Sequence, residues 1–299
     1  MYSEIDIKNK LIKHGEEVFK SHKQSVHWYS FETEINEFIN DLDNYPHAFV
    51  IACLCDKQIK AEKAWIIPFE LKKRIGNFEF ENLFKLTEKE IKEYFSQPSP
   101  LHRFPNEMSK NIYSAIQRIG NKYEGDASKI WSDKPSSAEV VSRLLEFDGF
   151  GPKIATMTAN LLARELKVKF SDYYSIDISV DVHVRRVFYR LGLSKKDSTT
   201  EQVIYKARAL NPEFPGMLDS ACYTIGKNWC RPQTKECDKC FMNDVCPSKV
   251  YDLSDDNLVY NIEGCIEMGM CTIVCDKLGK GAIKWNYPKG GKGVNFKFG

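Results

Sequence analysis

The sequence predicts an all-α protein of about two domains. Apolar residues recur every three or four positions in segments such as 4–22 and 88–95, which is the period of an amphipathic helix. No run of strictly alternating apolar and polar residues long enough for a strand precedes Tyr251. The length of 299 residues corresponds to about two domains of roughly 150 residues each.

The composition indicates a folded chain rather than a disordered one or a membrane protein. Hydrophobic residues make up 42% and charged residues 28%. The apolar run 48–55 falls far short of the ~20 residues of a membrane span, and residues 1–6 lack the basic and apolar regions of a secretion signal. We therefore expect a soluble intracellular protein of the cytoplasm or nucleoid, with cysteines that stay reduced unless a metal binds them.

The net charge is nearly neutral, but the charges are unevenly distributed. Lys and Arg number 43 against 41 Asp and Glu, a formal charge of +2. Residues 149–199 carry nine basic against five acidic residues, and residues 276–299 carry six against one. A surface that attracts DNA is therefore compatible with this total.

Four stretches rich in Pro or small polar residues predict loops between helices: 43–46, 97–100, 132–135 and 171–175. Between the last two, Ser136 and Glu139 form a capping-box pattern that opens one helix. This helix ends at the Gly149-Phe150-Gly151 turn, and Pro152 suits the first position of the next. The N–H groups at that helix start can bind a phosphate, although an ordinary helix turn has the same pattern.

Two residues, one just after this turn and one in a later segment, carry candidate chemistry. Lys153 lies in the first turn of the second helix, where the helix dipole disfavours its charged form, and a neutral amine is a nucleophile. A solvated surface lysine is the alternative. Asp181 precedes a further helix, and its simplest role is an N-cap.

The two segments together resemble the endonuclease III superfamily of DNA glycosylases, with its helix-hairpin-helix and its Gly/Pro-rich loop followed by Asp. The residues that carry the resemblance are Phe147-Asp148-Gly149-Phe150-Gly151-Pro152-Lys153-Ile154-Ala155 and Val180-Asp181-Val182-His183. The resemblance implies that Lys153 attacks the sugar C1′ and that Asp181 assists. The connection 165–178 is longer than usual in the family and contains a second candidate, Asp177.

Four cysteines predict a metal centre. Cys230, Cys237, Cys240 and Cys246 form C-x6-C-x2-C-x5-C, which favours metal binding over free thiols in a reducing compartment. The spacing alone leaves zinc and a [4Fe–4S] cluster equally open. The resemblance favours [4Fe–4S], because this spacing and place are those of the family's iron-sulfur loop. Cys53, Cys55 and Cys222 suit buried positions, and Cys265, Cys271 and Cys275 lack a nearby fourth ligand.

The resemblance also implies two helical domains with a cleft between them. An N-terminal helical segment, 1–45, would pack with a catalytic-Asp and iron-sulfur domain, 172–250. A helical-barrel domain with the helix-hairpin-helix would span 46–171. Residues 251–299 would form a basic C-terminal extension of unknown role.

The implied partner is double-stranded DNA that carries a damaged or mismatched base or an abasic site, bound by a monomer with the target nucleotide flipped into the cleft. The residues expected to contact this DNA are Gln58, Arg103, Phe104, Gly149, Phe150, Gly151 and Arg185. Asp56, next to Gln58, is also polar enough to read a base edge. A solvated helix turn at 57–60 and an ordinary interhelical loop at 101–106 are the alternatives.

The resemblance therefore implies a base excision repair glycosylase with abasic-site lyase activity. A monofunctional glycosylase, in which Asp181 activates water, keeps the same fold. A DNA-binding or damage-sensing protein without catalysis is the third hypothesis. The lesion that is removed does not follow from the sequence.

Overall fold

The computed structural model describes residues 3–21, 32–248, 251–254 and 257–260. The prediction of an all-α fold is confirmed, because helices make up both cores of this described part. The α-helices are α1 (Glu4–Lys20), α2 (Thr33–Asn40), α3 (Pro46–Cys55), α4 (Ala61–Ala64), α5 (Ile67–Ile75), α6 (Phe80–Lys85), α7 (Glu88–Ser96), α8 (Pro105–Tyr123), α9 (Ser137–Leu145), α10 (Pro152–Arg164), α11 (Val182–Arg190), α12 (Thr200–Leu210) and α13 (Leu218–Asn228). Three short 3-10 helices are η1 (Ala127–Ile130), η2 (Pro215–Met217) and η3 (Cys237–Lys239).

The first core is built around α3. Every residue of this helix is buried, as its sequence of almost uninterrupted apolar residues requires, since a helix that is apolar on all sides must be covered on all sides. Helices α2, α5, α8 and α10 pack against it. The predicted burial of Cys53 and Cys55 is confirmed.

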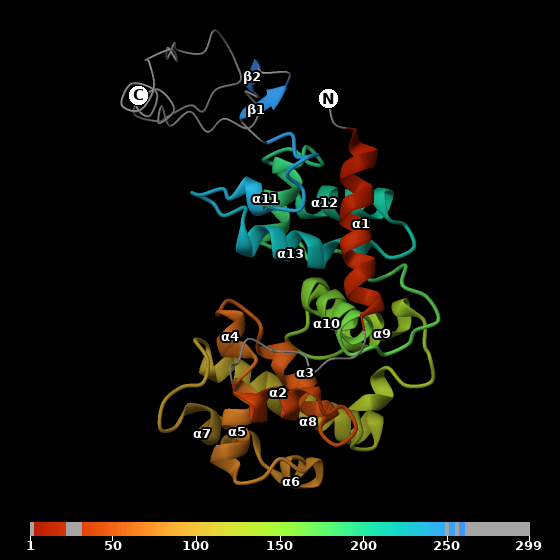
Figure 1. Cartoon of the computed structure of the whole chain (residues 1–299). Coiled ribbons are helices and arrows are strands. Elements are labelled where there is room, and N and C mark those ends of the chain that lie inside the picture. Colours follow the sequence, from red (N-terminus) through yellow and green to blue (C-terminus); the bar gives the residue numbers. More distant parts are fainter. Residues whose placement is uncertain (1–2, 22–31, 249–250, 255–256, 261–299) are drawn as a thin grey trace.

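The second core joins the start of the chain to its later part. Ile7 and Leu11 of α1 are buried with residues of α11, α12 and α13, and α1 packs against α13 (Figure 1). Cys222 is buried there, as predicted. The segment 1–45 therefore divides between the two cores, because Ile35 and Phe38 of α2 belong to the first core.

The hairpin between α9 and α10 lies near the junction of the two cores (Figure 1). The predicted capping box forms, with Ser136 and Glu139 each bonding the other's backbone N–H, and Pro152 begins α10. Gly149 adopts φ 90°, and a Cβ there would lie 2.6 Å from Asn111 Nδ2. Only glycine satisfies both the turn and this close approach.

A two-stranded antiparallel hairpin follows the helices. Strands β1 (Tyr251–Ser254) and β2 (Asn257–Tyr260) pair Tyr251 with Tyr260 and Ser254 with Asn257. Most of the predicted extension 251–299, including Cys265, Cys271 and Cys275, lies outside the described residues. Among the described helices, none is long and apolar enough to span a membrane.

The conformation of Gly149 leads to a prediction about stability. We expect Gly149→Ala to lower the free energy of unfolding by about 1–3 kcal/mol, because alanine is strained at this φ and its Cβ would overlap Asn111 and Leu54. Urea denaturation followed by circular dichroism measures the change.

Gly151→Ala is the matched control. Gly151 has φ −92°, and a Cβ there would face open space. The free energy of unfolding of the Gly151→Ala protein should therefore change by less than about 1 kcal/mol. Equal effects of the two substitutions would contradict this account of the hairpin.

Candidate active site and cysteine cavity

Asp181 is the N-cap of α11, as its position before the helix predicts. Its Oδ1 accepts hydrogen bonds from the backbone N–H groups of His183 and Val184, both at 2.8 Å. These bonds fix the orientation of the carboxylate and leave Oδ2 available to a ligand. The side chain is partly exposed.

Lys153 is exposed in the first turn of α10. No side chain caps this helix at its N-cap, Gly151. In contrast, α1, α7, α9 and α12 each begin with a capping box. The N–H groups at the start of α10 are therefore open to an anion from outside the chain.

Asp56 connects these two residues electrostatically. It follows α3 and is partly buried, and burial raises the pKa of its carboxyl group. The Lys153 charge opposes this rise in pKa, whereas the Asp181 charge adds to it. The charges at the starts of α10 and α11 thus act on the carboxyl group that follows α3.

A further carboxyl group, Asp219, lies in the first turn of α13 and binds the backbone two residues before Asp181. Its carboxylate accepts hydrogen bonds from the Ser179 N–H, at 3.3 and 3.2 Å to the two oxygens, and from Asn160 Nδ2 at 3.2 Å. Burial raises the pKa of Asp219 to about 6, with the Arg164 charge acting in the opposite direction. Sequence reasoning missed this residue, because nothing near it in the chain separates it from an ordinary acidic residue in the first turn of α13.

Asp177, the second carboxylate candidate, is held elsewhere. Arg208 donates two hydrogen bonds to it, from Nε at 2.7 Å and from Nη2 at 2.8 Å. This bidentate ion pair occupies both carboxylate oxygens. Of the two candidates, Asp181 is the one that keeps a carboxylate oxygen available to a ligand.

The two loops expected to face DNA from the first core lie together. His102 Nε2 bonds the Lys57 carbonyl oxygen at 3.1 Å, and Lys57 Nζ pairs with Glu107 at 2.7 Å. Gln58 is exposed at φ 57°. Arg103 is exposed over the ring of the partly buried Phe104, 5.2 Å from its centroid.

Two of the other predicted contact residues have partners within the chain. Phe150 is buried in the first core, so the hairpin offers its backbone rather than this ring. Arg185 is exposed but donates hydrogen bonds to the Ser198 carbonyl oxygen at 2.7 Å and to Thr200 Oγ1 at 2.5 Å. To contact a DNA phosphate as expected, Arg185 would have to give up these two hydrogen bonds in favour of the phosphate oxygens.

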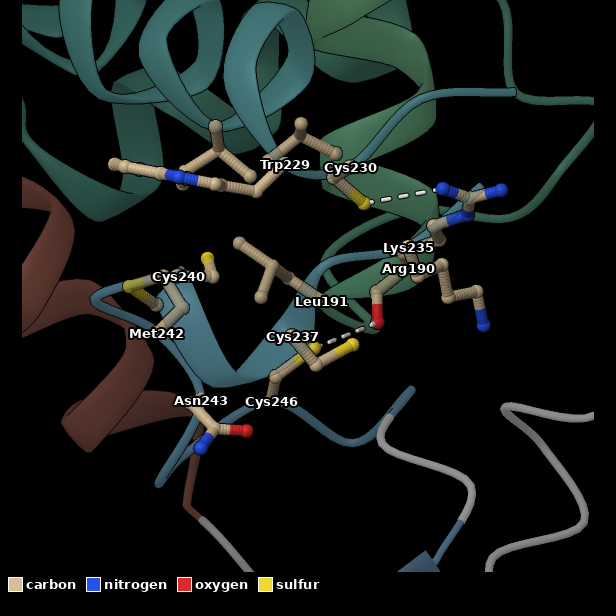
Figure 2. Close-up of a pocket in the computed structure, with 12 residues that line it drawn as sticks. Arg190, Leu191, Trp229, Cys230, Lys235, Cys237, Cys240, Met242, Asn243 and Cys246 are labelled. Atoms are coloured by element: carbon tan, nitrogen blue, oxygen red, sulfur yellow. Dashed lines mark hydrogen bonds between the residues drawn. The ribbon is translucent and has the colours of Figure 1, made fainter. Parts of the chain in front are cut away.

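The four cysteines of the predicted metal centre line one cavity (Figure 2). Leu191 and Met242 contribute apolar walls, and Trp229 covers one side. Arg190 Nη1 donates to Cys230 Sγ at 3.1 Å, and Cys246 Sγ donates to the Arg190 carbonyl oxygen at 3.9 Å.

Helix α11 anchors the loop that carries these cysteines. Arg186 donates to the carbonyl oxygens of Cys230 at 2.6 Å and Gly226 at 2.9 Å. Arg190 donates to the carbonyl oxygen of Arg231 at 2.8 Å. The helix that begins at Asp181 therefore holds the cysteine loop through arginines in its later turns.

Four thiols on one cavity are the donor set of either a zinc ion or a [4Fe–4S] cluster. Among the described residues, no three His, Cys, Asp or Glu side chains gather as ligands of one metal ion. A lone zinc ion would hold four sulfurs about 3.8 Å from one another, given Zn–S bonds of about 2.3 Å. A cluster places metal and sulfide between thiolates that lie farther apart. Burial raises the pKa of the Cys246 thiol to about 11, so binding must displace its proton.

Comparison with known proteins identifies related sequences and folds. Residues 51–213, more than half of the chain, match the family model described as HhH-GPD superfamily base excision DNA repair protein. Endonuclease III of Thermotoga maritima is 28% identical over 174 residues, which cover 54% of this chain and 74% of that protein. The solved structure of a non-covalent endonuclease III–DNA complex shares the fold with a TM-score of 0.54 at 17% identity, covering 82% of this chain and 96% of that one.

A shorter similarity is to ferredoxin-like proteins. One from Sinorhizobium fredii is 48% identical over 56 residues, which make up 18% of this chain and 56% of the relative. The chain therefore spans little more than half the length of this relative.

The raised pKa of Asp219 leads to a pH-dependent prediction. Because its folded pKa of about 6 lies above the ordinary value of 3.8, this carboxyl group stabilises the fold most at low pH and loses that contribution as pH rises through about 6. We compare the free energy of unfolding of Asp219→Asn with that of the unsubstituted protein at each pH. We expect this difference to be roughly 1–3 kcal/mol more favourable to the variant at pH 7 than at pH 4.

Urea unfolding of both proteins at the two pH values measures this difference. Glu62→Gln, at an exposed carboxylate, is the control. A difference between Asp219→Asn and the unsubstituted protein that stays constant with pH would show that Asp219 does not titrate in this way.

Proposed function

This chain belongs to the HhH-GPD superfamily of base excision DNA repair proteins, and from that premise we propose that it is a DNA glycosylase that also cleaves abasic sites. Lys153 is the nucleophile and Asp181 the assisting carboxylate. The observation that carries the proposal is the N-cap geometry of Asp181, which leaves one carboxylate oxygen available, while Lys153 lies exposed at the uncapped start of α10.

The proposed reaction begins when the neutral amine of Lys153 attacks C1′ of a flipped nucleotide. The glycosidic bond breaks, the base leaves with that electron pair and takes a proton from water, and the amine proton passes to the free oxygen of Asp181. Opening of the sugar gives a Schiff base, from which loss of a C2′ proton expels the 3′ phosphate. The carboxylate of Asp181 also stabilises the positive charge that develops on the sugar.

DNA would bind across the loops of both cores. The uncapped N–H groups at the start of α10 suit a backbone phosphate. Gln58 and the Arg103–Phe104 pair, on the two linked loops, suit the space that the flipped nucleotide leaves in the stack. We propose that the protein binds DNA in this way as a monomer.

We propose that Cys230, Cys237, Cys240 and Cys246 hold a [4Fe–4S] cluster. Four thiols that line one cavity, in the spacing and place of the family's iron-sulfur loop, support this proposal. When bound, the cluster cross-links a short loop that has little core of its own. The residues of the chain, rather than the cluster, carry out the proposed reaction.

The ferredoxin-like similarity supports a second candidate function, a further iron-sulfur centre for electron transfer. Eight of the ten cysteines follow residue 213, whereas residues 1–50 contain none. We infer that the ferredoxin-like stretch lies in this later region. Cys265, Cys271 and Cys275 are the cysteines there that neither the proposed first cluster nor the second core uses.

Borohydride trapping tests the proposed nucleophile. We expect the protein to form a covalent adduct with an abasic duplex in the presence of borohydride, and Lys153→Ala to abolish it, because only a Schiff base is reduced to a stable bond. Asp181→Asn should lower the rate of trapping about 100-fold or more while the fold persists, since asparagine also caps helices.

An undiminished adduct from Lys153→Ala would refute the lyase mechanism. Excision of a base without any adduct would instead favour the monofunctional mechanism, in which Asp181 activates water. Unchanged activity and DNA binding in Asp181→Asn would favour a protein without catalysis at this site.

Iron analysis tests both proposed centres. We expect the full-length protein to contain more than about four iron atoms per chain, as two centres require. Cys271→Ser should remove only the excess and keep abasic-site cleavage, whereas Cys237→Ser should lose the iron of the first cluster and lower the thermal midpoint.

The two centres can fail separately in this experiment. About four iron atoms per chain, unchanged by Cys271→Ser, would exclude the second centre. Zinc in place of iron would show that the cluster assignment is wrong.

A further inference from the structure

Asp56 is a carboxyl group that the proposed reaction does not use. Its side chain makes no hydrogen bond or ion pair with any residue that the structure describes, although it is partly buried. A partly buried carboxyl group without a partner loses hydration and gains no hydrogen bond in return. Its position therefore costs stability unless a ligand compensates.

The surroundings hold Asp56 rigidly. It follows α3, a helix in which every residue is buried, and its backbone N–H donates to the Cys53 carbonyl oxygen at 3.1 Å. The next residue, Lys57, is fixed on both sides, since its carbonyl oxygen bonds His102 and its amine pairs with Glu107. A carboxyl group on such a support can select a ligand by geometry.

The other charged groups that act on Asp56 come from three helices. They are Lys153 at the start of α10, Asp181 at the start of α11 and Glu62 of α4. The end of α3 also packs on the hairpin before Lys153, since a Cβ at Gly149 would lie 2.8 Å from Leu54 Cδ1. Asp56 therefore lies on the side of the first core from which Lys153 is proposed to act at C1′. A base that is attached to C1′ and has been flipped into this site must lie close to it.

We propose that Asp56 is the specificity-determining residue of the site and that it accepts hydrogen bonds from N–H groups on the edge of the flipped base. This inference rests on the proposed glycosylase function and names its substrate class. The site would favour bases with an N–H donor on that edge and reject bases that present a methyl group or only acceptors there. Such rejection is strong because a base without a donor would leave the carboxylate acceptor buried and unpaired.

Two substrates separate base recognition from chemistry. The first is a panel of duplexes that carry an oxidised pyrimidine, uracil, mismatched thymine or oxidised guanine. The second is a duplex with a preformed abasic site, which has no base to recognise. Asp56→Asn keeps the shape of the side chain but replaces one acceptor with a donor.

We expect Asp56→Asn to slow excision of the best panel base by about 10- to 100-fold. Cleavage and borohydride trapping at the abasic site should stay within about twofold of the unsubstituted protein, which also reports that the variant is folded. The ratio of excision rates between this base and the same base methylated at the recognised N–H should be smaller in Asp56→Asn than in the unsubstituted protein. Glu62→Gln removes an exposed neighbouring carboxylate and should leave all three measurements unchanged.

The outcomes distinguish this inference from the function on which it rests. An equal loss of excision and abasic-site cleavage in Asp56→Asn, or unchanged excision and preference, would overturn the role of Asp56 and leave the glycosylase proposal intact. A wild-type protein that neither excises a panel base nor forms the abasic adduct would overturn the proposed function itself.

Discussion

The pair of hydrogen bonds that Asp181 accepts at the start of α11 connects the candidate chemistry to the fold. One carboxylate oxygen binds two backbone N–H groups, which satisfies the helix end and orients the other oxygen. Later in the same helix, Arg186 and Arg190 bind the backbone of the cysteine loop. Displacing α11 would therefore disturb the candidate carboxylate and the proposed cluster site together.

The site depends on two cores that meet at the helix-hairpin-helix. Helices α3 and α10 belong to the first core and bring Asp56 and Lys153, whereas α11 belongs to the second and brings Asp181. A site assembled from two cores can place opposite charges close together without any of them being neighbours in sequence. The glycine at 149 makes this arrangement possible, because a side chain there would push α10 away from α3 and α8.

The features that the sequence predicted correctly depend on neighbours within a few residues. The capping box at Ser136, the first-turn proline at 152 and the N-cap at Asp181 are local patterns with one structural meaning each. The features that it did not predict depend on packing between distant segments. Asp219 meets Ser179 across 40 residues, and Asp177 meets Arg208 across 31, so neither pair has a local pattern.

Asp56 and Asp219 show why a raised pKa alone does not identify a functional carboxyl group. Burial raises the pKa of both, and the Asp181 charge adds to the rise in each case. Asp219 accepts hydrogen bonds from Ser179 and Asn160, so its carboxylate already has the partners that a buried group needs. Asp56 has none within the described chain. A rise in pKa of the same direction and main cause therefore accompanies a supporting role in one carboxyl group and leaves the other available to a ligand.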